Sequence, residues 1–66
     1  MQIILNGEPR DVPDNITAAQ LVEMLSLTDK RIAMERNETI VPRSQYETVR
    51  LAPNDRIEII HAVGGG

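Results

Sequence analysis

The sequence predicts an α+β domain in which one helix packs across a single mixed sheet of four to five strands. Only one segment repeats its apolar residues with helical spacing, whereas several short segments alternate apolar and polar residues as strands do. Turn-forming residues separate these segments. Their order is strand, strand, helix, strand, a short strand region and strand, which is the pattern of the β-grasp fold.

The chain begins with a predicted hairpin. Residues 1–6 alternate as a strand, and Asn6-Gly7 is a strong turn signal that lets residues 10–12 pair back. Pro9 and Pro13 lie on the returning segment. Because proline has no N–H to donate to a ladder, we expect this segment to be an edge strand.

A helix with a well-marked start follows the hairpin. Thr17 is the expected N-cap, and Gln20 completes a capping box with it. Ile16 and Leu21 occupy the two positions of a hydrophobic staple. The buried stripe consists of Ala18, Leu21, Val22 and Leu25, with Met24 at its margin. We expect the helix to end near Leu27.

The second half of the chain returns to strand patterns. The expected extended segments are residues 31–36, 39–41, 48–51 and 56–61. Asn37-Glu38 and residues 53–55 have the composition of turns, and a single helical turn is expected around Tyr46. If Ile57 and Ile59 face the helix, Ile60 must face the opposite side of the sheet.

Composition excludes several classes of function. A chain of 66 residues forms one small domain, and without cysteine it has no disulfide, thiolate metal site or thiol nucleophile. A net charge of −3 with no basic run disfavours nucleic-acid binding. The N-terminal residues resemble no signal peptide, and no segment is long enough to span a membrane. We therefore expect a cytoplasmic protein that binds neither membrane nor nucleic acid.

The end of the chain is its most informative segment. We expect residues 1–63 to form the domain and residues 64–66 to form a flexible tail, because three glycines have no side chains to pack. Fully extended, the segment from Val63 to Gly66 would reach roughly 13–14 Å. Gly64, Gly65 and Gly66 could thread into a narrow channel of a partner enzyme. There the Gly66 carboxylate would become an electrophile once activated, for example as a mixed anhydride with a nucleotide.

A partner could also use the face of the sheet away from the helix. Ile4 and Ile60 are expected on neighbouring central strands of that face, and Ala62 and Val63 continue toward the tail. These four residues are the candidate docking surface. Isolated exposed apolar residues are also common on ordinary protein surfaces.

Several motifs together resemble a known family. They are Met1-Gln2-Ile3, the capped helix, Arg36-Asn37, Val41-Pro42-Arg43, residues 55–59 and Val63-Gly64-Gly65-Gly66. Over its whole length the chain is similar to the ThiS family, the ubiquitin-like sulfur carriers of bacterial thiamine biosynthesis. The Gly-Gly ending alone is less specific, because ubiquitin-like modifiers and the small subunit of molybdopterin synthase share it.

The resemblance implies a carrier and not an enzyme. An E1-like adenylyltransferase of the ThiF type would use ATP and magnesium to form an acyl-adenylate on Gly66. A sulfur donor system with a cysteine desulfurase would convert it to a thiocarboxylate, and a thiazole synthase of the ThiG type would take the sulfur. The carrier itself would hold no permanent cofactor or metal and supply no catalytic residue.

Other interpretations remain open from the residues. The same carrier could supply sulfur for molybdopterin or another thiolated product, or the chain could be a non-catalytic β-grasp interaction module. His61 is the single histidine and has no carboxylate at ligand spacing, so we expect a surface residue there. Glu35 and Glu58, at outward strand positions, have no acid–base partner in the pattern.

Overall fold

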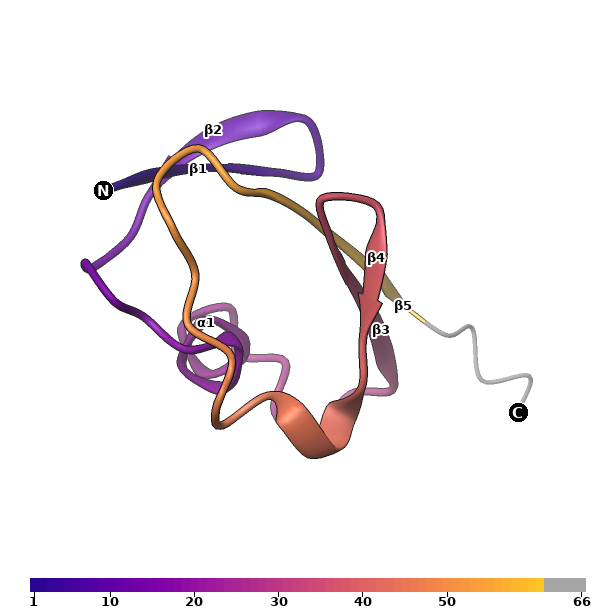
Figure 1. The fold of residues 1–66 in the computed structure, drawn as a ribbon. Helices are drawn as coiled ribbons and strands as arrows, with labels where there is room; N and C mark the ends of the chain where they lie inside the picture. The colour runs from indigo at the N-terminus through magenta and orange to yellow at the C-terminus, as the bar shows by residue number, and fades with distance from the viewer. Residues whose placement is uncertain (62–66) are drawn as a thin grey trace.

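A computed structural model describes residues 1–61 and confirms one helix on one mixed sheet (Figure 1). The sheet lies along the top and right of the view, and α1 lies on its concave side. The elements are β1 (Gln2–Leu5), β2 (Glu8–Asp11), α1 (Ala18–Met24), β3 (Ile32–Arg36), β4 (Thr39–Val41), the 3-10 turn η1 (Arg43–Gln45) and β5 (Arg56–His61).

The strand order is β2-β1-β5-β3-β4, so β5, the last strand within residues 1–61, lies in the centre of the sheet. β5 pairs in parallel with β1 and antiparallel with β3. The crossover between the parallel strands contains α1, as such connections require. β2 is an edge strand, as predicted, and Pro9 pairs opposite Ile4. The returning strand runs over Glu8–Asp11 and not over the expected residues 10–12, and Pro13 lies after it.

Both hairpins turn on residues with positive φ. Asn6 and Gly7 have φ of 50° and 84°, and Asn37 and Glu38 have φ of 50° and 71°. A two-residue turn of this kind matches the right-handed twist of its flanking strands. Both turns were predicted from sequence, although Glu38 is an unusual residue for this backbone conformation.

The start of α1 is as predicted, but its end is not. Thr17 Oγ1 accepts a hydrogen bond from Gln20 N–H, and Gln20 Oε1 accepts one from Thr17 N–H. The helix ends at Met24, three residues before the expected end at Leu27. Ser26 has a φ of 59° and Leu27 N–H donates to Val22 O, which is the closing bond of a Schellman motif.

The core lies between α1 and the covered face of the sheet. Ile3, Leu21, Met34 and Ile57 are completely buried, and Ile59 is nearly so. The segment 48–51, expected as a short strand, forms a single bridge between Arg50 and Thr17 instead. Leu51 is nevertheless buried, and its N–H donates to Ile16 O. The apolar residues of this segment therefore pack beside the start of the helix and not into the sheet.

Candidate functional site

The feature that leads to the candidate site is β5, the strand that precedes the glycine tail. Asp55 fixes its first end. The Asp55 carboxylate accepts hydrogen bonds from Arg36 Nε at 2.8 Å, Asn37 Nδ2 at 3.1 Å and Ala52 N–H at 2.8 Å. In return, Asn37 Oδ1 accepts the N–H of Arg56 at 2.9 Å. The turn of the β3–β4 hairpin is thereby tied to the beginning of β5.

Asp55 is charged in this arrangement although it is buried. Burial alone raises the pKa of its carboxyl group. The hydrogen bonds from Ala52, Asn37 and Arg36, with the positive charge of Arg36, outweigh that effect and lower the pKa of Asp55 below its usual value. Sequence analysis placed Asp55 only in a turn, because its partners lie 18 and 19 residues away along the chain.

Asn6 fixes the middle of β5. Its backbone N–H donates to Ile57 O at 2.9 Å, and its side-chain Oδ1 accepts the N–H of Ile59 at 2.9 Å. The side chain thus takes the place that a further residue of β1 would occupy in the ladder. The Asn-Gly turn signal predicted the bend here but gave no sign of this contact across 53 residues.

The structure puts two of the four candidate docking residues on the open face of the sheet. Ile60 is 54% exposed and pairs opposite Ala33, whereas Ile4 is half-buried and pairs opposite Arg56. The register therefore separates Ile4 and Ile60 by four residues along β5, about 13 Å at the usual strand rise. Ala62 and Val63 lie outside the described residues, and the docking role remains a prediction.

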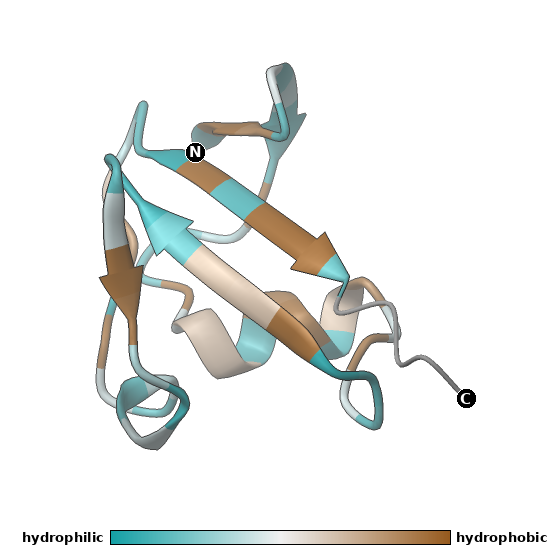
Figure 2. Cartoon of the chain, turned by 90° about the vertical axis from the view of Figure 1, so that its right-hand side faces the viewer, coloured by the Kyte–Doolittle hydropathy of each residue, from teal (hydrophilic) through white to brown (hydrophobic). Residues whose placement is uncertain are grey.

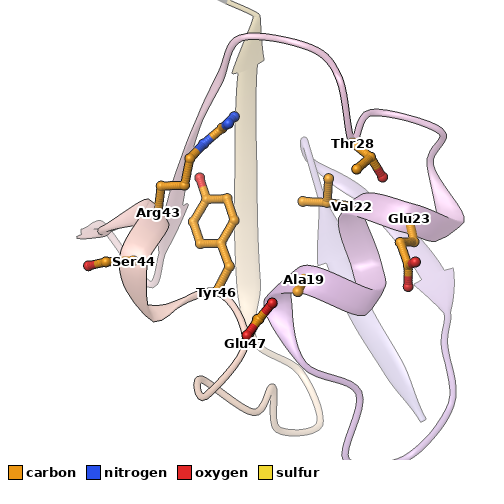
Figure 3. A pocket seen from close by; sticks show the side chains of 8 residues that line it. All are labelled: Ala19, Val22, Glu23, Thr28, Arg43, Ser44, Tyr46 and Glu47. Carbon is orange, nitrogen blue, oxygen red and sulfur yellow. The ribbon is translucent and has the colours of Figure 1, made fainter.

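A groove of about 490 Å³ lies between α1 and the 3-10 turn. Figure 3 shows the ring of Tyr46 between the two elements, with Arg43 at one rim and Glu47 at the opposite end. The Arg43 guanidinium donates to Lys30 O at 3.1 Å, which ties the turn to the segment before β3. Within residues 1–61, no hydrogen bond joins a hydroxyl group of the groove to Glu23 or Glu47, so the groove offers no oriented nucleophile and base.

The remaining predicted residues carry no site in the described part of the chain. Glu35 and Glu58 face each other across β3 and β5, and His61 is exposed at the end of β5. Residues 1–61 contain no cluster of potential metal ligands, and none of their helices is long and apolar enough to cross a membrane. The predicted reactive and threading residues, Gly64, Gly65 and Gly66, lie outside the described residues.

The fold, one helix on a mixed five-stranded sheet with β5 in its centre, is that of a ubiquitin-like β-grasp protein. The model of the ThiS family matches residues 3–66, which include the tail. The chain therefore belongs to the ThiS family.

Individual relatives agree with this assignment. The chain is 40% identical over 65 residues to the sulfur carrier protein ThiS of Bacillus subtilis, covering 94% of this chain and 96% of the relative. It is 39% identical to a thiazole synthase of Magnetococcus marinus over all 66 residues, but spans only 20% of that protein. The crystal structure of ThiS from Geobacter metallireducens has the same fold, with a TM-score of 0.86 at 22% identity and full coverage of both chains.

Proposed function

We propose that this chain is a sulfur carrier for thiazole formation in thiamine biosynthesis, and that the carboxylate of Gly66 is the group that is modified. The observation that carries the proposal is the family match, which runs through residue 66 and so includes the whole tail. The position of β5 supports it, because the contacts of Asp55 and Asn6 hold the beginning and the middle of the strand that precedes the tail in sequence. Residues 62–66 lie beyond that anchored strand in sequence.

The chemistry requires one activation of the carboxylate, a substitution by sulfur and a thiol–disulfide exchange. A Gly66 oxygen attacks the α-phosphorus of ATP on an adenylating partner, and pyrophosphate leaves with the bonding electrons. The terminal sulfur of a persulfide then attacks the acyl carbon and AMP leaves. A second thiol cleaves the resulting acyl disulfide and releases the thiocarboxylate. Proximity is the carrier's contribution, since the partner holds the reacting atoms.

The partners follow from the same proposal. An adenylating enzyme of the ThiF type supplies ATP and Mg²⁺, a cysteine desulfurase system supplies sulfur, and a thiazole synthase of the ThiG type consumes it. Relatives named thiazole synthase that match this entire chain support the last partner. No residue of this chain acts as acid, base or metal ligand in the scheme, and the reaction takes place in the cytoplasm.

Intact-mass spectrometry tests the proposal directly. Incubation with the adenylating enzyme, ATP and a sulfur donor should add the mass difference of one sulfur replacing one oxygen, localised to Gly66. Deletion of Gly66, or one residue added after it, should abolish pyrophosphate release. We expect both variants to keep the thermal midpoint of the parent, because the described core is formed by residues between Ile3 and Ile59. Turnover of either variant at the parent rate would refute the mechanism.

A further inference from the structure

The second half of β5 is an unguarded sheet edge. β1 pairs with β5 only through Arg56 and Ile57, whereas β3 pairs with β5 as far as His61. Figure 2 shows β5 in front, continuing past the β1–β2 hairpin with β3 along one side only. The strand is therefore central at its beginning and an edge at its end.

The free backbone groups on this edge can be identified. The N–H and C=O of one strand residue point to the same edge, and successive residues alternate. Ile57 O and Ile59 N–H bond to Asn6 on the β1 side, so His61 also faces that side. Within residues 1–61, neither Ile59 C=O nor His61 N–H has a partner there. Edge groups of this kind are a template for another strand.

The geometry also specifies the direction of that strand. The N–H of Asn6 donates to Ile57 O, and the side-chain carbonyl of Asn6 accepts from Ile59 N–H. In a parallel strand, the backbone N–H and C=O of a single residue make the same two bonds. The next bonds in this register would join one residue to Ile59 C=O and His61 N–H. A parallel segment in line with β1 satisfies both.

An apolar side chain lies beside this position on each face, next to the exposed polar residues Glu58 and His61. Leu5, the last residue of β1, is half-buried on the helix side, and Ile60 is 54% exposed on the open side. An extended segment with alternating aliphatic side chains would cover both. The other two sheet edges carry features that disfavour pairing with another strand. β2 contains Pro9, which has no N–H to donate, although its residues are exposed to solvent. β4 has only three residues and is followed by Pro42.

The geometry points to an extended segment of the thiazole synthase as the occupant, paired in parallel with β5 at Ile59–His61. The inference rests on the proposed function. Thiazole synthase is chosen because relatives with that name contain a match to this whole chain, so the matching segment and the rest of that enzyme belong to one polypeptide. Backbone pairing at His61 would hold the carrier a few residues before its reactive end.

A pair of substitutions at one position isolates the backbone donor. His61→Pro removes an N–H that faces away from β3 and leaves the β3–β5 ladder intact, whereas His61→Ala removes only the imidazole. We expect His61→Pro to weaken binding to purified thiazole synthase about tenfold and His61→Ala to change it by less than about twofold. Equal affinities of the two variants, measured by calorimetry, would overturn the inference.

Amide hydrogen exchange of the unaltered chain provides a test that needs no variant. The His61 amide should exchange rapidly in the free protein and become protected when thiazole synthase is added. An amide that still exchanges rapidly in the saturated complex would exclude backbone pairing. This measurement holds even if His61→Pro folds poorly.

Three further outcomes separate this inference from the proposed function and test the choice of the occupant. Both variants should still be adenylated and acquire sulfur at Gly66, so failure of the parent chain in that assay would refute the function and not the docking mode. An equal loss of binding by His61→Pro to the adenylating enzyme would overturn the choice of thiazole synthase. A dimer of the free chain that His61→Pro dissociates would assign the edge to a second copy and also overturn it.

Discussion

Substitution of Asp55 tests whether its hydrogen bonds hold β5 in place. Asp55→Ala removes the acceptor for three donors and leaves Ala52 N–H without this partner. Hydrogen bonds to a charged group contribute about 1.5–3 kcal/mol each and are not additive, so we expect a loss of about 3 kcal/mol. Since a chain of this size has a total stability of roughly 3–10 kcal/mol, that loss is a large fraction. Asp55→Asn keeps one acceptor and should cost about 1–2 kcal/mol.

The pH dependence of the free energy of unfolding separates the contribution of the Asp55 charge from that of its side-chain shape. Because the folded state lowers the pKa of Asp55, its ionised form stabilises the fold above the unfolded pKa of about 3.9, and this contribution is lost as pH falls through the folded pKa. The stability difference between the parent and Asp55→Asn should therefore be largest near neutrality and shrink below about pH 4. Urea unfolding of both proteins across this range measures it.

A matched control uses an acidic residue without this burial. Asp29→Asn removes the same charge from an exposed position and should change stability by less than about 0.5 kcal/mol at any pH. An Asp55→Asn variant as stable as the parent at neutral pH would refute the reasoning. So would a difference that remains unchanged in acid.

Substitutions at three further positions test the elements around β5. Thr17→Ala removes the N-cap and should cost about 1 kcal/mol in urea unfolding, whereas Thr17→Ser should restore most of it. Asn6→Gly keeps the positive φ but loses the bond to Ile59, so it should cost about 1 kcal/mol, and Asn6→Ala should cost more because alanine disfavours this φ. An Asn6→Gly variant as stable as the parent would refute the side-chain role. Glu58→Gln removes a like charge directly opposite Glu35 and should raise stability by about 0.2–1 kcal/mol, with a smaller gain in high salt.

Local signals predicted most of the fold because their causes lie within a few residues. Asn6-Gly7 adopts the positive φ that its composition favours, and the Thr17–Gln20 capping box joins residues three apart. Alternation placed Ile57 and Ile59 on the buried face correctly. Each of these features depends on the stereochemistry of a few neighbouring residues, or on the alternation of side chains along one strand.

The sequence predictions were wrong where the local structure depends on contacts between distant residues, or on a residue type that is uncommon in its conformation. The helix ends early because Ser26 takes the left-handed conformation usually occupied by glycine, so the sequence offers no stop signal there. Segment 48–51 has a strand pattern, but Arg50 pairs with Thr17 at the helix start and not with the sheet. The Asp55 contacts were missed because composition assigns such a residue to a turn.

The exposed edge of β5 also requires the register to be known, because the strand's pattern alone is that of a central strand. Alternation shows that Ile60 faces outward, but only the pairing shows that β1 stops opposite Ile57. A partly aliphatic edge favours self-association unless it is guarded, as Pro9 guards β2. Proline at position 61 would remove the free donor without disturbing the ladder to β3, yet the chain has histidine there. The backbone donor that pairing requires is thus retained at the last described residue before the tail.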